Sequence, residues 1–213
     1  MPEKDKTEAS KDRETVISDP RVSASLAEEA IKDHSKLRNI IFLLYDENMV
    51  RRFSAARVLG EVARRAPELM MQKWERIFRA FDDTMSCWGA AEALGEVARN
   101  LPQHRGKIML FLRGFRRDEC SCQGYIWGMC RICQVDREKI SDFVPELKGF
   151  LLSQNICVTG QALWALGELG IKEVAWKIRG FLSDERETWI YQNDSVRRKT
   201  IGMIAGEALA KLE

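Results

Sequence analysis

A ten-residue string occurs twice in this chain, and this repeat limits the possible folds more than any other feature. Residues 55–64 read AARVLGEVAR, and residues 90–99, which lie 35 positions later, read AAEALGEVAR. Self-similarity at a fixed period of about 20 to 50 residues is typical of repeat architectures, in which each unit buries its apolar face against its neighbours. The repeat therefore predicts a stack of small units that recognises other molecules along a surface.

The repeat extends through the chain as five blocks when Gly60 is taken as the anchor position. The anchors are Gly60, Gly95, Cys130, Gly167 and Gly206, at spacings of 35, 35, 37 and 39 residues. The positions ten before, one before and two after each anchor are apolar or cysteine in every block. After the first block, each also has an upstream amphipathic segment and an acidic or polar turn. This pattern predicts that each block is a helical hairpin.

The N-terminal part of the chain differs from the repeats in composition. Residues 1–21 are dominated by charge and carry few apolar side chains, so we expect a flexible tail. From Ser23 to Leu44 apolar residues recur at helical spacing, with a break expected near His34 and Ser35. The sequence therefore predicts one domain over residues 22–213.

Composition excludes several classes of protein. The chain has 213 residues, 45% of them hydrophobic, and a net charge of +2 from 34 basic and 32 acidic residues, so nucleic-acid binding is disfavoured. No apolar run reaches the length of about 18 residues expected of a membrane helix, and no secretion signal is evident. Without a secretion signal, the six cysteines indicate reduced thiols and a cytoplasmic protein.

The first block resembles a known repeat family. Its pattern, Asp46-x3-Val50-Arg51-x3-Ala55-Ala56-x2-Leu59-Gly60-Glu61, is similar to the short HEAT repeats of phycobilisome-lyase-type proteins in the HEAT/armadillo superfamily. The resemblance covers about residues 40–213, and the third block departs from it at residues 123–127. It implies an all-α fold, a right-handed superhelical solenoid of about five hairpins whose second helices line a concave surface.

Four cysteines have a spacing that invites a metal site. Cys120, Cys122, Cys130 and Cys133 form C-x-C-x7-C-x2-C, which could bind zinc or an iron–sulfur cluster. If one helix carries this segment, however, Cys122 and Cys130 are separated by about 12 Å of helical rise, too far for one metal. The repeat alignment favours core packing instead, because Cys130 and Cys133 replace glycine and alanine. Cys87 and Cys122 align with polar residues, so we expect them to be partly exposed.

One face of the second helices combines tryptophan with glutamate. Positions seven and three before each anchor and one after it share a helical face. The candidate partner-binding residues on this face are Trp88, Glu92, Glu96, Trp127, Arg131, Trp164, Glu168 and Met203. They predict a groove with an aromatic floor and acidic edges, which would suit a basic protein or peptide. In the alternative, the tryptophans pack into the next repeat and the glutamates pair with arginines of the stack.

Motifs for catalysis are missing from the sequence. His34 and His104 are the only histidines, and neither precedes glutamate as in a His-Glu metal motif. We therefore expect a non-catalytic protein-binding scaffold without a cofactor. The resemblance and the tryptophans leave a tetrapyrrole lyase or chaperone as the alternative, and a cysteine-ligated metal or redox protein is less favoured. Glu96 and Glu168 argue against a DNA-alkylation-repair type of HEAT protein.

Overall fold

The computed structural model describes residues 20–70, 72, 90–117, 121–192 and 195–213. Within these ranges the α-helices are α2 (Pro20–Lys32), α3 (His34–Phe42), α4 (Met49–Arg65), α6 (Ala90–Asn100), α7 (Arg105–Leu112), α8 (Cys122–Cys133), α9 (Ile140–Phe150), α10 (Ile156–Leu169), α11 (Ala175–Arg179) and α12 (Ile201–Ala210), and residues 67–70 are also helical. Short 3-10 helices are η1 (Leu43–Tyr45), η2 (Pro102–His104), η3 (Arg113–Arg117), η4 (Arg137–Lys139) and η5 (Lys172–Val174). The strands β1 (Glu187–Gln192) and β2 (Ser195–Thr200) form an antiparallel pair. The described chain is thus mostly helical, with one small sheet.

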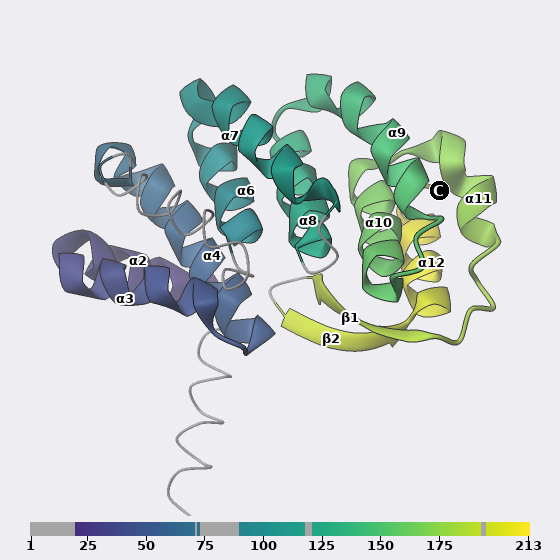
Figure 1. Cartoon of the computed structure of the whole chain (residues 1–213), viewed down its shortest axis with the longest axis horizontal. Helices are drawn as coiled ribbons and strands as arrows, with labels where there is room; N and C mark the ends of the chain where they lie inside the picture. The colour runs from purple at the N-terminus through teal and green to yellow at the C-terminus, as the bar shows by residue number, and fades with distance from the viewer. Residues whose placement is uncertain (1–19, 71, 73–89, 118–120, 193–194) are drawn as a thin grey trace, which may run out of the picture.

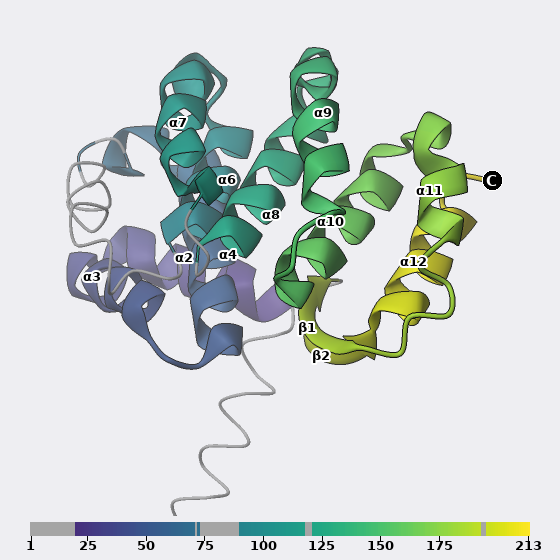
Figure 2. The same cartoon turned by 45° about the vertical axis from the view of Figure 1, so that its right-hand side comes forward.

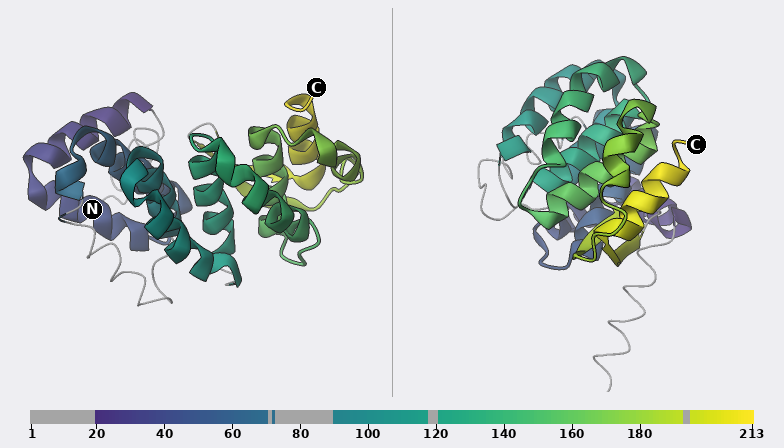
Figure 3. Two further views of the ribbon diagram at one scale, coloured as in Figure 1. Left: turned by 90° about the horizontal axis from the view of Figure 1, so that it is seen from above. Right: turned by 90° about the vertical axis from the view of Figure 1, so that its right-hand side faces the viewer.

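The second helices of the predicted blocks lie side by side in a row. Helix α4 packs against α6, α6 against α8, α8 against α10 and α10 against α12, while α2 covers α4 at the N-terminal end. Figure 1 shows this row, with α7 and α9 in a second layer. In Figure 2 the helices α7, α9 and α11 lie along the same side of the row. Figure 3 shows the N-terminal helices and α12 at opposite ends of the molecule.

Glycines at the anchor positions let neighbouring second helices approach closely. A Cβ atom added to Gly95 would overlap the Cα atom of Gly128 in α8. A Cβ atom on Gly60 would lie 2.6 Å from the Cβ of Glu96, and one on Gly167 would lie 2.7 Å from the Cα of Ala208. A side chain at any of these three crossings would push the helices apart, and this close approach explains why the repeat retains glycine there.

Capping residues divide the helices where the sequence pattern changes. The Asp33 carboxylate accepts a hydrogen bond from the backbone N–H of Ser35 at 2.8 Å, which separates α2 from α3 one residue before the predicted break. In the same way the Asn155 side chain accepts from the backbone N–H of Cys157 at 3.0 Å and starts α10. These caps satisfy N–H groups that a helix end leaves unbonded.

The fifth block contains a β-hairpin, which the repeat alignment did not predict. The alignment places Lys199 on a helix with Met203, but residues 195–200 form β2 and pair with β1 in the register Glu187↔Thr200. β-Branched and aromatic residues at 188–191 favour a strand. Thr200 then accepts a hydrogen bond from the backbone N–H of Met203 at 3.1 Å and begins α12. The helical prediction is therefore wrong for residues 196–200 and correct from residue 201.

Some sequence predictions fall outside the described residues. The proposed tail is one of them up to residue 19, since α2 begins at Pro20. The upstream segment of the second block, at residues 74–81, is another. Within the described ranges, no helix has both the length and the apolar character needed to cross a membrane.

Candidate functional site

A pocket opens on the face that the second helices share, toward their C-terminal ends. Its volume is about 420 Å³. The described residues that line it are Ser23, Ala24, Arg57, Glu61, Arg64, Glu96, Arg99, Asn100, Arg131 and Val135. We call it the arginine pocket. The repeat itself builds this site, because Glu61, Glu96 and Arg131 each follow an anchor by one residue, and Arg64 and Arg99 follow one by four.

Glu96 connects the helices on two sides of the pocket. Only 5% of the residue is exposed, and its Oε1 accepts a hydrogen bond from Nε of Arg131 at 2.5 Å. The Arg131 side chain also donates from NH1 to Oε1 of Gln134 at 2.8 Å and lies over the Trp127 ring, with its Cζ atom 5.5 Å from the ring centroid. Arg131 is thus held by a carboxylate, an amide and an aromatic ring.

Glu61 is bound to arginines of its own helix. Arg64 donates to the Glu61 carboxylate from Nε at 3.0 Å and from NH2 at 2.5 Å, and Arg65 donates from Nε at 2.6 Å. The hydrogen bonds from Arg64 are the main cause that lowers the pKa of Glu61 to about 2. Glu61 is therefore ionised at neutral pH.

Arg99 has a single, distant ion-pair partner among the described residues. Its NH1 lies 4.0 Å from Oε2 of Glu96, which is an ion pair at the limit of contact. Burial lowers the pKa of Arg99, repulsion by Arg131 and Arg57 lowers it further, and the attraction of Glu96 opposes them. Burial and the two neighbouring guanidinium groups thus outweigh the attraction of Glu96.

Arginine is the most frequent residue in the described lining of the pocket. Arg57, Arg64, Arg99 and Arg131 line it together with the carboxylates of Glu61 and Glu96. Arginine donates several hydrogen bonds in a planar fork and is suited to carboxylate and phosphate groups. The described lining of the pocket therefore combines ion pairs with guanidinium groups of the kind that bind anions.

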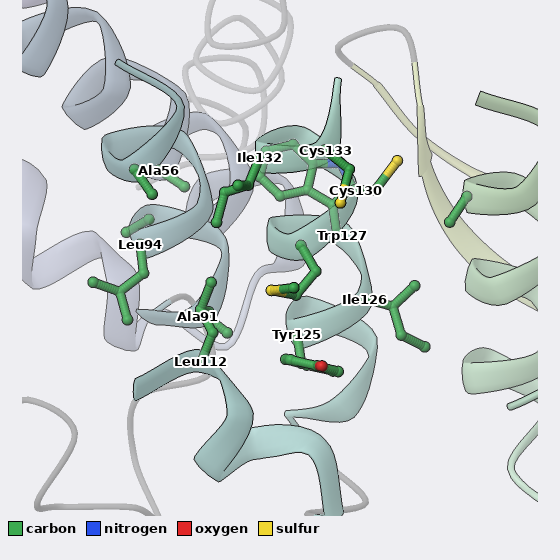
Figure 4. Close-up of a cluster of buried hydrophobic side chains, with 14 of the residues drawn as sticks. Ala56, Ala91, Leu94, Leu112, Tyr125, Ile126, Trp127, Cys130, Ile132 and Cys133 are labelled. Carbon is green, nitrogen blue, oxygen red and sulfur yellow. The ribbon is translucent and has the colours of Figure 1, made fainter. Parts of the chain in front are cut away.

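The tryptophans of the predicted groove are buried. Trp127 is 2% exposed and Trp164 is 7% exposed, so the prediction of an exposed aromatic floor is wrong for both. Figure 4 shows Trp127 within the buried cluster, near Ile132 and Cys133. The alternative, in which the tryptophans pack into the stack, is confirmed for Trp127 and Trp164. Trp88 lies outside the described residues.

The unpredicted β-hairpin covers part of the face on which the groove was expected. It packs on α10 and reaches α4. The Cγ2 atom of Thr188 would lie 2.8 Å from a Cβ atom on Gly160, which is on the same face of α10 as Trp164. On α8, Nε2 of Gln123 donates to the backbone oxygen of Trp189 at 2.9 Å. The hairpin therefore covers the N-terminal half of the predicted face and leaves the arginine pocket open.

The remaining predicted residues are distributed over several environments. Glu92 is 5% exposed, and burial raises its pKa to about 7, so it is an interior residue. Glu168 is bound by Nζ of Lys211 and lies 3.4 Å from Nε2 of Gln134. Met203 is 55% exposed on α12. Of the eight predicted binding residues, Glu96 and Arg131 line the arginine pocket.

The cysteines on α8 are core residues. Cys130 and Cys133 are fully buried, as predicted, and burial raises the pKa of Cys133 to about 12. Cys122 is 4% exposed, so the prediction that it is partly exposed is wrong. Cys87 and Cys120 lie outside the described residues. Among the described residues, no group of three or more histidine, cysteine, aspartate or glutamate side chains could hold a metal ion.

Sequence reasoning missed Arg57, Arg64 and Arg99 as members of one site. The tryptophans drew attention to the other end of the same helical face. The signal that identifies the pocket is arginine four residues after the anchor in two successive blocks, together with Arg131 after the third anchor. No protein-family model and no curated protein sequence match the chain.

Proposed function

We propose that this protein is a non-catalytic binding module that recognises an acidic segment of a partner protein. The observation that carries the proposal is the arginine pocket, to which three successive second helices contribute guanidinium groups. An acidic segment would place carboxylate or other anionic groups against these donors.

The repeated helices support a scaffold role. Successive second helices are in direct contact, and glycine anchors lie at their crossings. We infer that the blocks form a solenoid of HEAT-like hairpins, whose rigid row holds the pocket residues at fixed spacing. A partner would then be recognised by the positions of charged groups along the row.

The proposed partner is acidic, whereas the sequence pattern predicts a basic partner. That expectation of a basic partner depends on glutamates that are available to bind it. Glu61 and Glu96 are paired with arginines, Glu168 with Lys211, and Glu207 with Lys199. The tetrapyrrole alternative depends on exposed tryptophans, and Trp127 and Trp164 are buried. Binding of an acidic partner is therefore the function that the geometry supports best.

Capture from a lysate of the source cells tests this proposal. The full chain is immobilised, and the captured proteins are compared with those bound by Arg57→Gln/Arg99→Gln, which removes two guanidinium groups from the pocket but leaves Glu96 paired with Arg131. Arg179→Gln, at an exposed position on α11, is the matched control. We expect the double variant to lose a partner with an acidic segment that the wild type and the control retain. Equal capture by all three proteins would refute the proposal.

A further inference from the structure

The β-hairpin crosses the shared face of the second helices as an extended arm. Figure 1 shows it running from α12 past the lower ends of α10 and α8, and β2 reaches α4 in the first block. Both strands leave from one point, because the backbone N–H of Ile201 donates to the backbone oxygen of Arg186 at 2.9 Å. The second helices pack directly on one another without the hairpin. It can therefore swing about its base while the row stays together.

The strand β1 lies on α8 and α10 in the way that a bound extended segment would. Exposure alternates along it, because Thr188 and Ile190 are 4% and 0% exposed whereas Trp189 between them is 51% exposed. The Cγ2 atom of Thr188 fills the space over Gly160 that a Cβ atom there would need. On α8, the side-chain amide of Gln123 donates to the backbone oxygen of Trp189 at 2.9 Å. These contacts hold one backbone group and one side-chain face of an extended chain.

Two buried hydrogen-bond donors on α10 remain unused on this face. Among the described residues, Nε2 of Gln161 and Nε1 of Trp164 have no hydrogen-bond partner, and the two residues are 0% and 7% exposed. Oε1 of Gln161 lies 3.4 Å from Nε2 of Gln123, so the Gln161 amide is next to the contact with β1. Trp164 is one turn beyond Gly160, on the face of α10 that Thr188 covers. A buried donor without an acceptor is costly, so the hairpin is an imperfect occupant.

We propose that Gln123, Gly160, Gln161 and Trp164 form a site for an extended segment of another protein, and that the hairpin occupies this strand site in the free protein. The segment places a β-branched aliphatic side chain at the position of Ile190 and a small side chain over Gly160. Its backbone oxygens accept from Gln123 and from the two donors that β1 leaves unused. Binding therefore requires the hairpin to open. The strand site is separate from the arginine pocket, so failure of either proposal leaves the other standing.

Peptide binding to the full chain, followed by fluorescence anisotropy, tests the proposal. The probe is a fluorescein-labelled peptide of residues 185–192, ERETWIYQ, which copies β1. Ile190→Asp puts a charge at a fully buried position and expels the hairpin, whereas Trp189→Asp changes the neighbouring exposed position and is the matched control. We expect the peptide to bind Ile190→Asp at least about tenfold more tightly than the wild type or the control, because a tethered occupant competes at high effective concentration. The same peptide with aspartate in place of isoleucine should not bind.

Hydrogen exchange of the wild-type chain decides the question even if Ile190→Asp does not fold. We expect the hydrogen-bonded amides of β1 and β2 to exchange at least about tenfold faster than those of α8 and α10, and saturating ERETWIYQ peptide to speed their exchange further. Exchange of the hairpin at the rate of the helices, unchanged by the peptide, would overturn the proposal. Equal affinity of the wild type and Ile190→Asp for the peptide would also overturn it. So would binding to Ile190→Asp that the added changes Gln123→Ala and Gln161→Ala leave unaltered.

Discussion

Glu92 allows the free-energy cost of burying a charge in this fold to be tested. The residue is 5% exposed, and its Oε2 has no hydrogen-bond partner among the described residues. Its carboxyl faces α8, where a Cβ atom added to Gly124 would lie 2.7 Å from Oε1. Burial raises the pKa of Glu92 to about 7, against an opposing attraction from Arg52. Glu92→Gln keeps the shape of the side chain and removes its ability to ionise.

The expected magnitude follows from the two pKa values of Glu92. A shift from 4.5 in the unfolded chain to about 7 in the folded protein corresponds to about 3 kcal/mol. Between these values the folded protein holds a proton that the unfolded chain has released, so stability falls as pH rises. The loss is complete above about pH 7, where the folded protein must bury an ionised carboxylate. Glutamine avoids this cost.

Urea denaturation followed by tryptophan fluorescence measures the effect. We expect Glu92→Gln to be more stable than the wild type by about 3 kcal/mol at pH 8, with the difference almost absent near pH 4.5. Glu138→Gln, at an exposed position, is the control and should change stability little at either pH. If Glu92→Gln is destabilising at pH 8, or if its effect does not change with pH, then pairing with Arg52 outweighs burial and the reasoning fails.

Two further predictions concern packing. Gly95→Ala would force a Cβ atom onto Gly128 and should lower the free energy of unfolding by at least about 2 kcal/mol, whereas Gly106→Ala, with open space around it on α7, should raise it by about 0.5 to 1 kcal/mol. Thermal or urea unfolding of the two glycine variants checks both changes. Equal effects on stability would contradict the close crossing of α6 and α8 at Gly95. Trp127→Ala should cost about 3 to 5 kcal/mol, and a change under about 1 kcal/mol would show that Trp127 is not core.

The repeat predicted the helices more accurately than it predicted their surroundings. Its anchors locate the crossings at Gly60, Gly95 and Gly167, because two helices that pack closely require small residues at the point of contact. The hairpin of β1 and β2 was missed because the alignment continued the helical spacing through residues 196–200. Strand formation there depends on pairing with residues 187–192, which periodicity along one helix does not reveal.

The helical face that carries the candidate site was predicted correctly, but the chemistry of the site was not. Helical geometry placed Glu96 and Arg131 on one face, and both line the pocket. The hairpin packs against the helix of Trp164, and the pairing of Glu96 depends on Arg131, which is 35 residues away along the chain. Such contacts between blocks decide which charges stay available, and one block alone does not contain that information.

Cys130 stands where α4, α6 and α10 have their anchor glycine, so a thiol separates α8 from α10. It is fully buried, and burial is the main cause that raises its pKa well above the usual value for cysteine, with Glu168 on α10 also contributing. A thiol in this state does not react with alkylating reagents while the two helices remain together. The rate at which Cys130 is alkylated would therefore report how often α8 and α10 separate. Cys130 would serve as a probe of local opening between the third and fourth blocks of the array.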